Sequence, residues 1–185
     1  NSPRCWVIDP IDGTENYLRG VPAWATLIGL MDGTEVVVGV VSAPALNRRW
    51  WASLGSGTYA GRSLHSATRC RVSGITDIAD AFFSYSSLDD WDTLGRGGGF
   101  ESLTRTCRRT RAFGDFWSYM LVAEGGVDIA SEPSVTLWDL AAVSLIVTEA
   151  GGQFTDLNGN PGPDGGSGLA TNGKLHTEVL DLLAN

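Results

Sequence analysis

Two aspartates stand three residues apart at the end of a short hydrophobic run, in the stretch WVIDPIDGTENY. If the chain turns between Asp9 and Asp12, both carboxylates can converge on one cation. Pro10 fixes φ and Gly13 permits a sharp bend, so the stretch can make such a turn. The turn would also free the backbone carbonyl of Ile11. Carboxylate and carbonyl oxygens are the ligands that Mg²⁺ prefers, so the stretch is a candidate metal loop.

The backbone amides of the same turn, at Gly13 and Thr14, could point at an anion. A second interpretation needs no ligand, because Asp, Pro and Gly often cluster in Asx-type turns whose aspartates face solvent. An EF-hand does not fit, since its acids alternate at every second residue and a Glu closes the loop. The six letters alone leave the metal loop and the solvated turn open.

A third aspartate, Asp139, stands in the stretch LWDLAA at the start of the strongest predicted helix. A carboxylate there is favoured by the helix dipole and by capping, so Asp139 fits an N-terminal cap as well as a ligand. The small side chains of Ala141 and Ala142 would let this helix approach another element closely.

The elements that must position these carboxylates alternate in type. Apolar runs bounded by turn residues predict strands, helical spacing predicts helices, and Asp32-Gly33 predicts a hairpin. Residues 92–99 predict a polar, glycine-rich loop. The pattern indicates a layered α/β fold in one domain over residues 1–185, with a sheet-rich metal-loop half at about 1–108 and an α/β half at about 109–185. Strands are expected at 6–8, 26–31, 36–43, 49–54, 81–85, 110–113, 127–130, 153–155 and 168–171, and helices at 100–109, 116–124, 138–150 and 176–183.

The composition excludes several classes of protein. A formal charge of −8 and a pI near 4.6 argue against a nucleic-acid binder, which needs a basic face. No apolar run approaches the roughly 18 residues of a membrane span. Three cysteines, Cys5, Cys70 and Cys107, lack CxxC spacing and suit a reducing, cytoplasmic compartment. The two histidines, His65 and His176, are interpreted as surface residues, so neither zinc nor nucleophilic chemistry is indicated.

Taken together and in order, the motifs resemble the inositol monophosphatase family of Mg²⁺-dependent phosphatases. The family signature DPxDGTxNF stands here as DPIDGTENY, and WDxAA followed by EAGG stands here as WDLAA and EAGG. Within that family the sequence is most similar to histidinol-phosphate phosphatases of the actinobacterial type. The similarity lies in the stretches RGVPAWATLIGL, VSAPALNRRWWA, SYSSL and RAFGDFWSYMLVAEG. The resemblance runs through essentially the whole chain.

The resemblance implies a role for each motif residue. Asp9, Asp12 and Asp139, with the Ile11 carbonyl, would hold two or three Mg²⁺ ions that activate water and offset phosphate charge. The amides of Gly13 and Thr14 would hold phosphate. The roles closest to the reaction would belong to Asp12 and to the Thr14 hydroxyl, which would orient the attacking water.

The substrate follows from the finer resemblance. Glu132 stands where the family places a carboxylate that contacts the substrate alcohol, and Asp115, beside Gly114, could face the same pocket. Two acids there would suit histidinol phosphate, which carries an ammonium group and an imidazole. The alternatives are an inositol-1-monophosphatase or broad sugar-phosphate phosphatase, and an inactive fragment that serves only as a binding or assembly module. A homodimer is also implied by the resemblance.

Two departures accompany the resemblance. The family's Gly-Glu-Glu metal motif lies upstream of the first signature, and nothing here precedes Asn1, so we expect an N-terminally truncated chain that binds metal weakly and exposes apolar surface. Glu15 stands where relatives often carry Lys or Thr. Its charge either perturbs phosphate binding or points outward.

Overall fold

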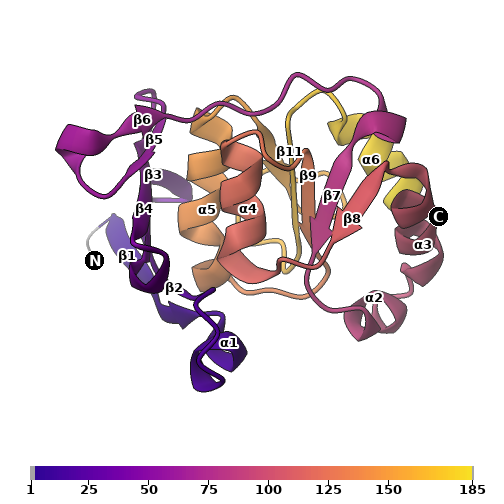
Figure 1. Cartoon of the computed structure of the whole chain (residues 1–185), viewed down its shortest axis with the longest axis horizontal. Coiled ribbons are helices and arrows are strands. Elements are labelled where there is room, and N and C mark those ends of the chain that lie inside the picture. The colour runs from indigo at the N-terminus through magenta and orange to yellow at the C-terminus, as the bar shows by residue number, and fades with distance from the viewer. Residues whose placement is uncertain (1–2, 185) are drawn as a thin grey trace.

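The computed structural model describes residues 3–184, which form four layers in the order sheet, helices, sheet, helices (Figure 1). The first sheet holds β1 to β6 and the second holds β7 to β11, with α4 and α5 between them. The remaining long helices, α3 and α6, lie on the far side of the second sheet together with α2. This arrangement confirms the layered α/β fold.

The first sheet is an antiparallel meander in which each strand pairs with the next along the chain. The hairpin predicted from Asp32-Gly33 is present between β2 and β3, and its two turn residues are Gly33 and Thr34. β1 is an edge strand of this sheet, so its last residues stand open to one side. The strands are β1 (Arg4–Asp12), β2 (Ala25–Asp32), β3 (Glu35–Ala43), β4 (Arg48–Ser53), β5 (Thr58–Gly61) and β6 (Thr68–Arg69).

The second sheet has the order β10-β11-β9-β7-β8, with β7 parallel to both β8 and β9. The parallel strands end at the same edge, near the start of α4. Short 3-10 turns cover 44–46, 64–66 and 78–80. The strands are β7 (Phe82–Tyr85), β8 (Arg109–Arg111), β9 (Ile129–Glu132), β10 (Gln153–Thr155) and β11 (Gly168–Thr171), and the helices are α1 (Thr14–Leu18), α2 (Asp89–Thr93), α3 (Gly97–Thr106), α4 (Asp115–Ala123), α5 (Leu137–Glu149) and α6 (His176–Leu183).

The central helix α5 is buried from Leu140 to Val147 because a sheet covers each side of it. Two paired glycines of the first sheet, Gly29 and Gly39, face it. A Cβ on Gly39 would lie 2.6 Å from the Ala142 carbonyl oxygen, and one on Gly29 would lie 3.0 Å from the Ala141 Cβ. The close approach expected of Ala141 and Ala142 is therefore confirmed. It also brings the first turn of α5 to the end of β1.

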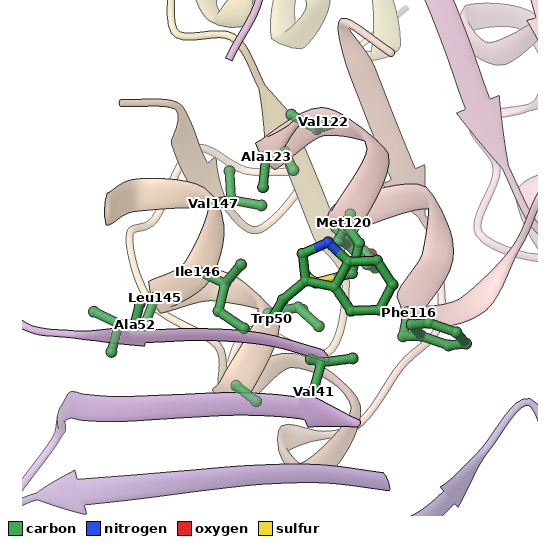
Figure 2. Close-up of a cluster of buried hydrophobic side chains, with 14 of the residues drawn as sticks. Val41, Trp50, Ala52, Phe116, Met120, Val122, Ala123, Leu145, Ile146 and Val147 are labelled. Carbon is green, nitrogen blue, oxygen red and sulfur yellow. The ribbon is translucent and has the colours of Figure 1, made fainter. Parts of the chain in front are cut away.

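The main core fills the space between the first sheet and the two central helices (Figure 2). Trp50 from β4 packs edge-on against Phe116 of α4, with ring centroids 6.2 Å apart. Burial of such aromatic and aliphatic side chains is the main favourable term in folding. The core therefore fixes the start of α4, as well as that of α5, against the sheet that carries the aspartate motif.

Two expectations were wrong. Residues 92–99 do not form a loop, because α2 ends at Thr93 and α3 begins at Gly97. A Cβ on Gly99 would lie 2.6 Å from the Leu182 carbonyl oxygen, so this glycine serves the packing of α3 on α6 rather than flexibility. His176 is not a surface residue: it is buried, with its ring between the hydroxyls of Thr155 and Thr171. The short elements β5, β6, α1 and α2 were not foreseen.

Candidate metal and phosphate site

The aspartate motif lies on a distorted edge of the first sheet. β1 continues through Asp12, and its register against β2 shifts between Asp9 and Asp12, so a bulge brings about the change of direction expected of a turn. Pro10 is tolerated because β1 is an edge strand. Gly13 follows with φ +76°, and a Cβ there would lie 2.8 Å from the Ala23 carbonyl oxygen. Glycine is therefore required on both counts.

The motif brings three carboxylates together across two elements. Asp9 and Asp12 from β1 and Asp139 from α5 each offer an oxygen, and these oxygens lie within 4.8 Å of one another. One oxygen of Asp139 accepts hydrogen bonds from the amide of Thr136, at 2.7 Å, and from its hydroxyl, at 2.8 Å. Asp139 thus closes a capping box and contributes to the cluster at once.

The cluster is electrostatically costly without a cation. Burial raises the pKa of Asp12 well above its usual value, although the Phe116 amide donates to this carboxylate at 2.8 Å. Burial also raises the pKa of Asp9, and the negative charge of Asp139 adds to the rise. Carboxylates this close disfavour one another's ionisation. A bound divalent cation would relieve that repulsion.

The start of α4 supplies the next carboxylate. Asp115 is the first residue of α4 and has φ +48°, a left-handed conformation that is uncommon outside glycine and costs free energy. Its oxygen accepts from the side-chain amide of Asn16 at 3.2 Å, and that amide also donates to the Ala23 carbonyl at 3.0 Å. Asn16 therefore ties α1 to α4. Burial, and then the charges of Asp139 and Asp9, raise the pKa of Asp115.

The end of β9 supplies another buried acid. Glu132 is 6% exposed. Burial raises its pKa to about 7, an effect that contacts with Tyr119 and Ser86 oppose and that the charges of Asp115 and Asp139 reinforce. A carboxyl group with such a pKa changes charge near neutral pH.

These residues line one cavity of about 510 Å³, together with Trp138, which is 52% exposed. Three parts of the lining contain residues that were predicted from sequence: β1 with α1, α4 with β9, and α5. The structure brings these three parts together. Gly114 is not among the residues that line the cavity, and a Cβ there would lie 3.8 Å from the Ser86 Cβ. Of the described residues that line it, none is basic and seven are acidic: Asp9, Asp12, Glu15, Asp90, Asp115, Glu132 and Asp139.

Sequence reasoning assigned no role to Asn16, Ser86, Asp90 or Trp138, which also line the cavity. Asn16 and Trp138 stand inside the two motifs, so the motif itself was the available signal for them. Ser86 stands inside SYSSL, which indicated only the resemblance, and Asp90 lies in α2, outside every motif.

A second recess, of about 590 Å³, lies between the β2–β3 hairpin and residues 159–163. Its described lining is largely apolar or hydroxylic and carries one ionisable side chain, Glu35. Although it is larger, it lacks the converging carboxylates that chemistry on a phosphate ester requires.

Comparison with known proteins places this architecture in a family. The model of the inositol monophosphatase family matches residues 1–185, and the chain belongs to that family. A histidinol-phosphatase of Streptomyces coelicolor is 60% identical over 98% of this chain and 70% of the relative. A histidinol-phosphatase of Mycobacterium tuberculosis is 54% identical, over 97% of this chain and 69% of the relative. The solved structure of an inositol monophosphatase from Thermotoga maritima matches all of this chain and 70% of its own, with a TM-score of 0.87 at 33% identity.

Members of this family are in general Mg²⁺-dependent phosphatases. The residues of this chain fit that ion, because the cluster offers only hard oxygen donors and repels itself without a cation. No helix within residues 3–184 has the length and apolar character needed to cross a membrane.

Proposed function

We propose that this protein is a Mg²⁺-dependent phosphomonoester hydrolase that acts on L-histidinol phosphate and releases L-histidinol and phosphate. The observation that carries the proposal is the single cavity in which a three-carboxylate cluster adjoins further buried acids. The two relatives named histidinol-phosphatase, 60% and 54% identical, support the substrate.

We assign the metal-binding role to Asp9, Asp12, Asp139 and the Ile11 carbonyl. The ions, two or three in number, would lower the pKa of water and offset phosphate charge when bound. Thr14 has a hydroxyl that donates to the Ile11 carbonyl at 2.8 Å, so the water-orienting hydroxyl and the carbonyl ligand are already in contact.

The remaining parts of the site would hold the substrate. The amides of Gly13 and Thr14 follow the bulge and would bind the phosphate oxygens. Asp115 and Glu132 lie beyond the metal cluster in the same cavity and would attract the ammonium and imidazole groups. Gly114, with φ +73°, would act only through the backbone that sets the position of Asp115. An anionic ester could thus enter an acidic cavity, because the carboxylates at one end would hold cations and Asp115 and Glu132 would face the substrate's own cationic groups.

The test is phosphate release in Mg²⁺, with kcat/KM compared for histidinol phosphate and inositol 1-phosphate. We expect a clear preference for histidinol phosphate, which Asp115→Asn and Glu132→Gln should each reduce. Asp80→Asn is the matched control, since Asp80 is exposed and does not line the cavity. A preference that survives both cavity substitutions would contradict the charge assignment, and a preference for the inositol ester would contradict the substrate.

Two alternatives make different predictions. An inositol-1-monophosphatase or broad sugar-phosphate phosphatase is favoured by the relatives of that name, and the same comparison of esters separates it. A binding or assembly module without catalysis would need no metal. Titration calorimetry with Mg²⁺ decides this, since we expect binding by the wild type and none by Asp139→Asn.

The wider setting follows from the same proposal. We place residues 1–185 in one inositol-monophosphatase-like domain of a cytoplasmic homodimer. Its small-molecule partner would be the phosphate ester, and we expect neither a nucleic-acid nor a membrane partner, because the charge of −8 disfavours polyanions.

A further inference from the structure

The position of one buried tyrosine is not explained by packing alone. Tyr119 of α4 is 1% exposed, and its ring packs against Phe154 with centroids 5.9 Å apart. A phenylalanine would make the same ring contacts. The Tyr119 hydroxyl is nevertheless buried without a hydrogen bond of regular geometry to any of residues 3–184. Burying a hydroxyl in this way opposes folding, so the group calls for an explanation.

The backbone of the second sheet places this hydroxyl beside Glu132. Glu132 pairs with Gly168 of the neighbouring strand β11. A Cβ on Gly168 would lie 2.7 Å from the Tyr119 hydroxyl oxygen, so the hydroxyl occupies the space that a side chain at 168 would fill. Ser131 fixes this position further, because its hydroxyl donates to the Gly168 carbonyl at 2.9 Å. The tyrosine hydroxyl therefore lies at the end of β9, beside Glu132, which lines the cavity.

The charges around the hydroxyl single out one partner. Burial, and then the negative charge of Glu132, raise the pKa of Tyr119 well above its usual value, with smaller effects from Asp12 and Asp139. The phenol therefore keeps its proton and can act only as a donor toward the carboxylates. Ser86 contacts Glu132 from the loop that follows β7, on the cavity side. Glu132 thus has two hydroxyl neighbours, Tyr119, which does not line the cavity, and Ser86, which does.

We propose that Tyr119 is a positioning residue that determines substrate specificity: its hydroxyl holds the Glu132 carboxylate so that one oxygen faces the nitrogen-bearing group of a cationic phosphate ester. This inference rests on the proposed function and deepens it, because it names the support that orients one of the two specificity carboxylates. Tyr119 itself does not line the cavity and touches no substrate.

The first experiment does not depend on turnover. Crystal structures of the wild type and of Tyr119→Phe compare the position of the Glu132 carboxylate. In the wild type we expect the tyrosine oxygen to lie about 2.6–2.8 Å from a carboxylate oxygen, as in a charge-assisted O–H···O bond. In the variant we expect the carboxylate to rotate or shift. A carboxylate that keeps its place without the hydroxyl would overturn the proposal.

The second experiment measures specificity. In Tyr119→Phe, we expect kcat/KM for histidinol phosphate to fall about tenfold, mostly through KM, as for loss of one hydrogen bond to a charged group. The value for inositol 1-phosphate should fall less, because this ester carries no cation to meet the carboxylate, so the preference for histidinol phosphate should decrease. Tyr59→Phe is the matched control, because Tyr59 lies on β5, away from the cavity. In a Glu132→Gln background the effect of Tyr119→Phe should disappear.

The two proposals fail in different ways. A wild type that releases phosphate from neither ester contradicts the proposed function, while the crystallographic comparison still decides the role of Tyr119. A wild type that prefers histidinol phosphate, with a Tyr119→Phe variant of unchanged preference, contradicts only the role of Tyr119.

Discussion

Two buried carboxylates mark the two ends of β9, and their surroundings differ. Asp128 stands just before the strand and Glu132 ends it, and each is 6% exposed. Asp128 accepts a hydrogen bond from the Phe82 amide at 2.7 Å and another from the Ser73 hydroxyl. The side-chain amide of Asn172 donates in turn to Ser73 at 2.9 Å. Donors thus surround Asp128.

Glu132 faces other acids instead. Asp115 and Asp139 act on it as like charges, and only Tyr119 and Ser86 oppose the rise of its pKa. Equal burial with opposite surroundings shows that burial alone does not make a carboxylate structural or functional. A carboxylate supplied with donors stabilises the fold, whereas one among like charges stores repulsion that a ligand can relieve.

The largest expected effect is the loss of activity on substitution in the cluster of Asp9, Asp12 and Asp139, whose carboxylates repel one another as those around Glu132 do. Asp12→Asn removes a proposed metal ligand and one of the repelling charges, so we expect kcat/KM to fall by about 10²–10³-fold or more. The free energy of unfolding measured without metal should not fall, because like-charge repulsion is relieved and an amide oxygen can still accept from the Phe116 amide. Assays with Mg²⁺ and denaturant titrations in EDTA measure the two effects. A loss of stability equal to that of a core substitution would contradict the comparison.

The opposite pattern is expected at the other end of β9. Asp128→Ala leaves the Phe82 amide and the Ser73 hydroxyl without their acceptor, so the free energy of unfolding should fall by about 2–3 kcal/mol. The folded protein should keep its kcat/KM, because Asp128 does not line the cavity. Urea titration and assays at a temperature well below the transition separate the two quantities. A selective loss of activity in a stable Asp128→Ala protein would show that the distinction between the two ends is wrong.

Much of the fold could be predicted from local pattern, and the failures have physical causes. Most strands were predicted because their apolar runs are bounded by turn residues. The helices α4, α5 and α6 were predicted because their apolar residues recur at helical spacing. The prediction of a loop at 92–99 was wrong because glycines such as Gly99 usually interrupt helices. Gly99 instead allows close contact with the α6 backbone, which is distant in sequence. His176 was predicted to lie on the surface because no local pattern in the sequence indicates that its ring contacts the hydroxyls of Thr155 and Thr171.

The site divides in the same way. The two motifs located the Asp9, Asp12 and Asp139 cluster because each motif is continuous in sequence. The parts brought in by strand order were missed, including Ser86 and the support of Glu132 by Tyr119. Pairing of β9 with β11 decides which residue stands opposite Glu132, and no local pattern in the sequence encodes that pairing.

The smallest expected effect is on the pH dependence of stability, where two buried groups act in opposite directions. The folded-state pKa of Glu132 is raised from 4.5 to about 7, so in that window the folded protein holds a proton that the unfolded chain has lost. The free energy of unfolding therefore falls as pH rises through it. The pKa of His176 is lowered from 6.5 to about 4 by burial, so the unfolded chain takes up a proton that the folded protein refuses. Stability from this group is complete above pH 6.5 and is lost as pH falls toward 4.

Single substitutions should separate the two slopes in metal-free protein. In Glu132→Gln, the slope of stability against pH between 4.5 and 6.5 should become more positive, because the substitution removes the contribution of Glu132, which falls with pH, and keeps that of His176, which rises. In His176→Gln, stability should fall as pH rises through that window. Each slope should change by about 1 kcal/mol per pH unit, near the limit set by one proton, whatever the absolute stability of the variant. Denaturant titrations in EDTA at several pH values measure this. If Glu132→Gln leaves the slope unchanged, Glu132 is ionised in the folded protein as readily as in the unfolded chain, and the contrast with Asp128 loses its electrostatic basis.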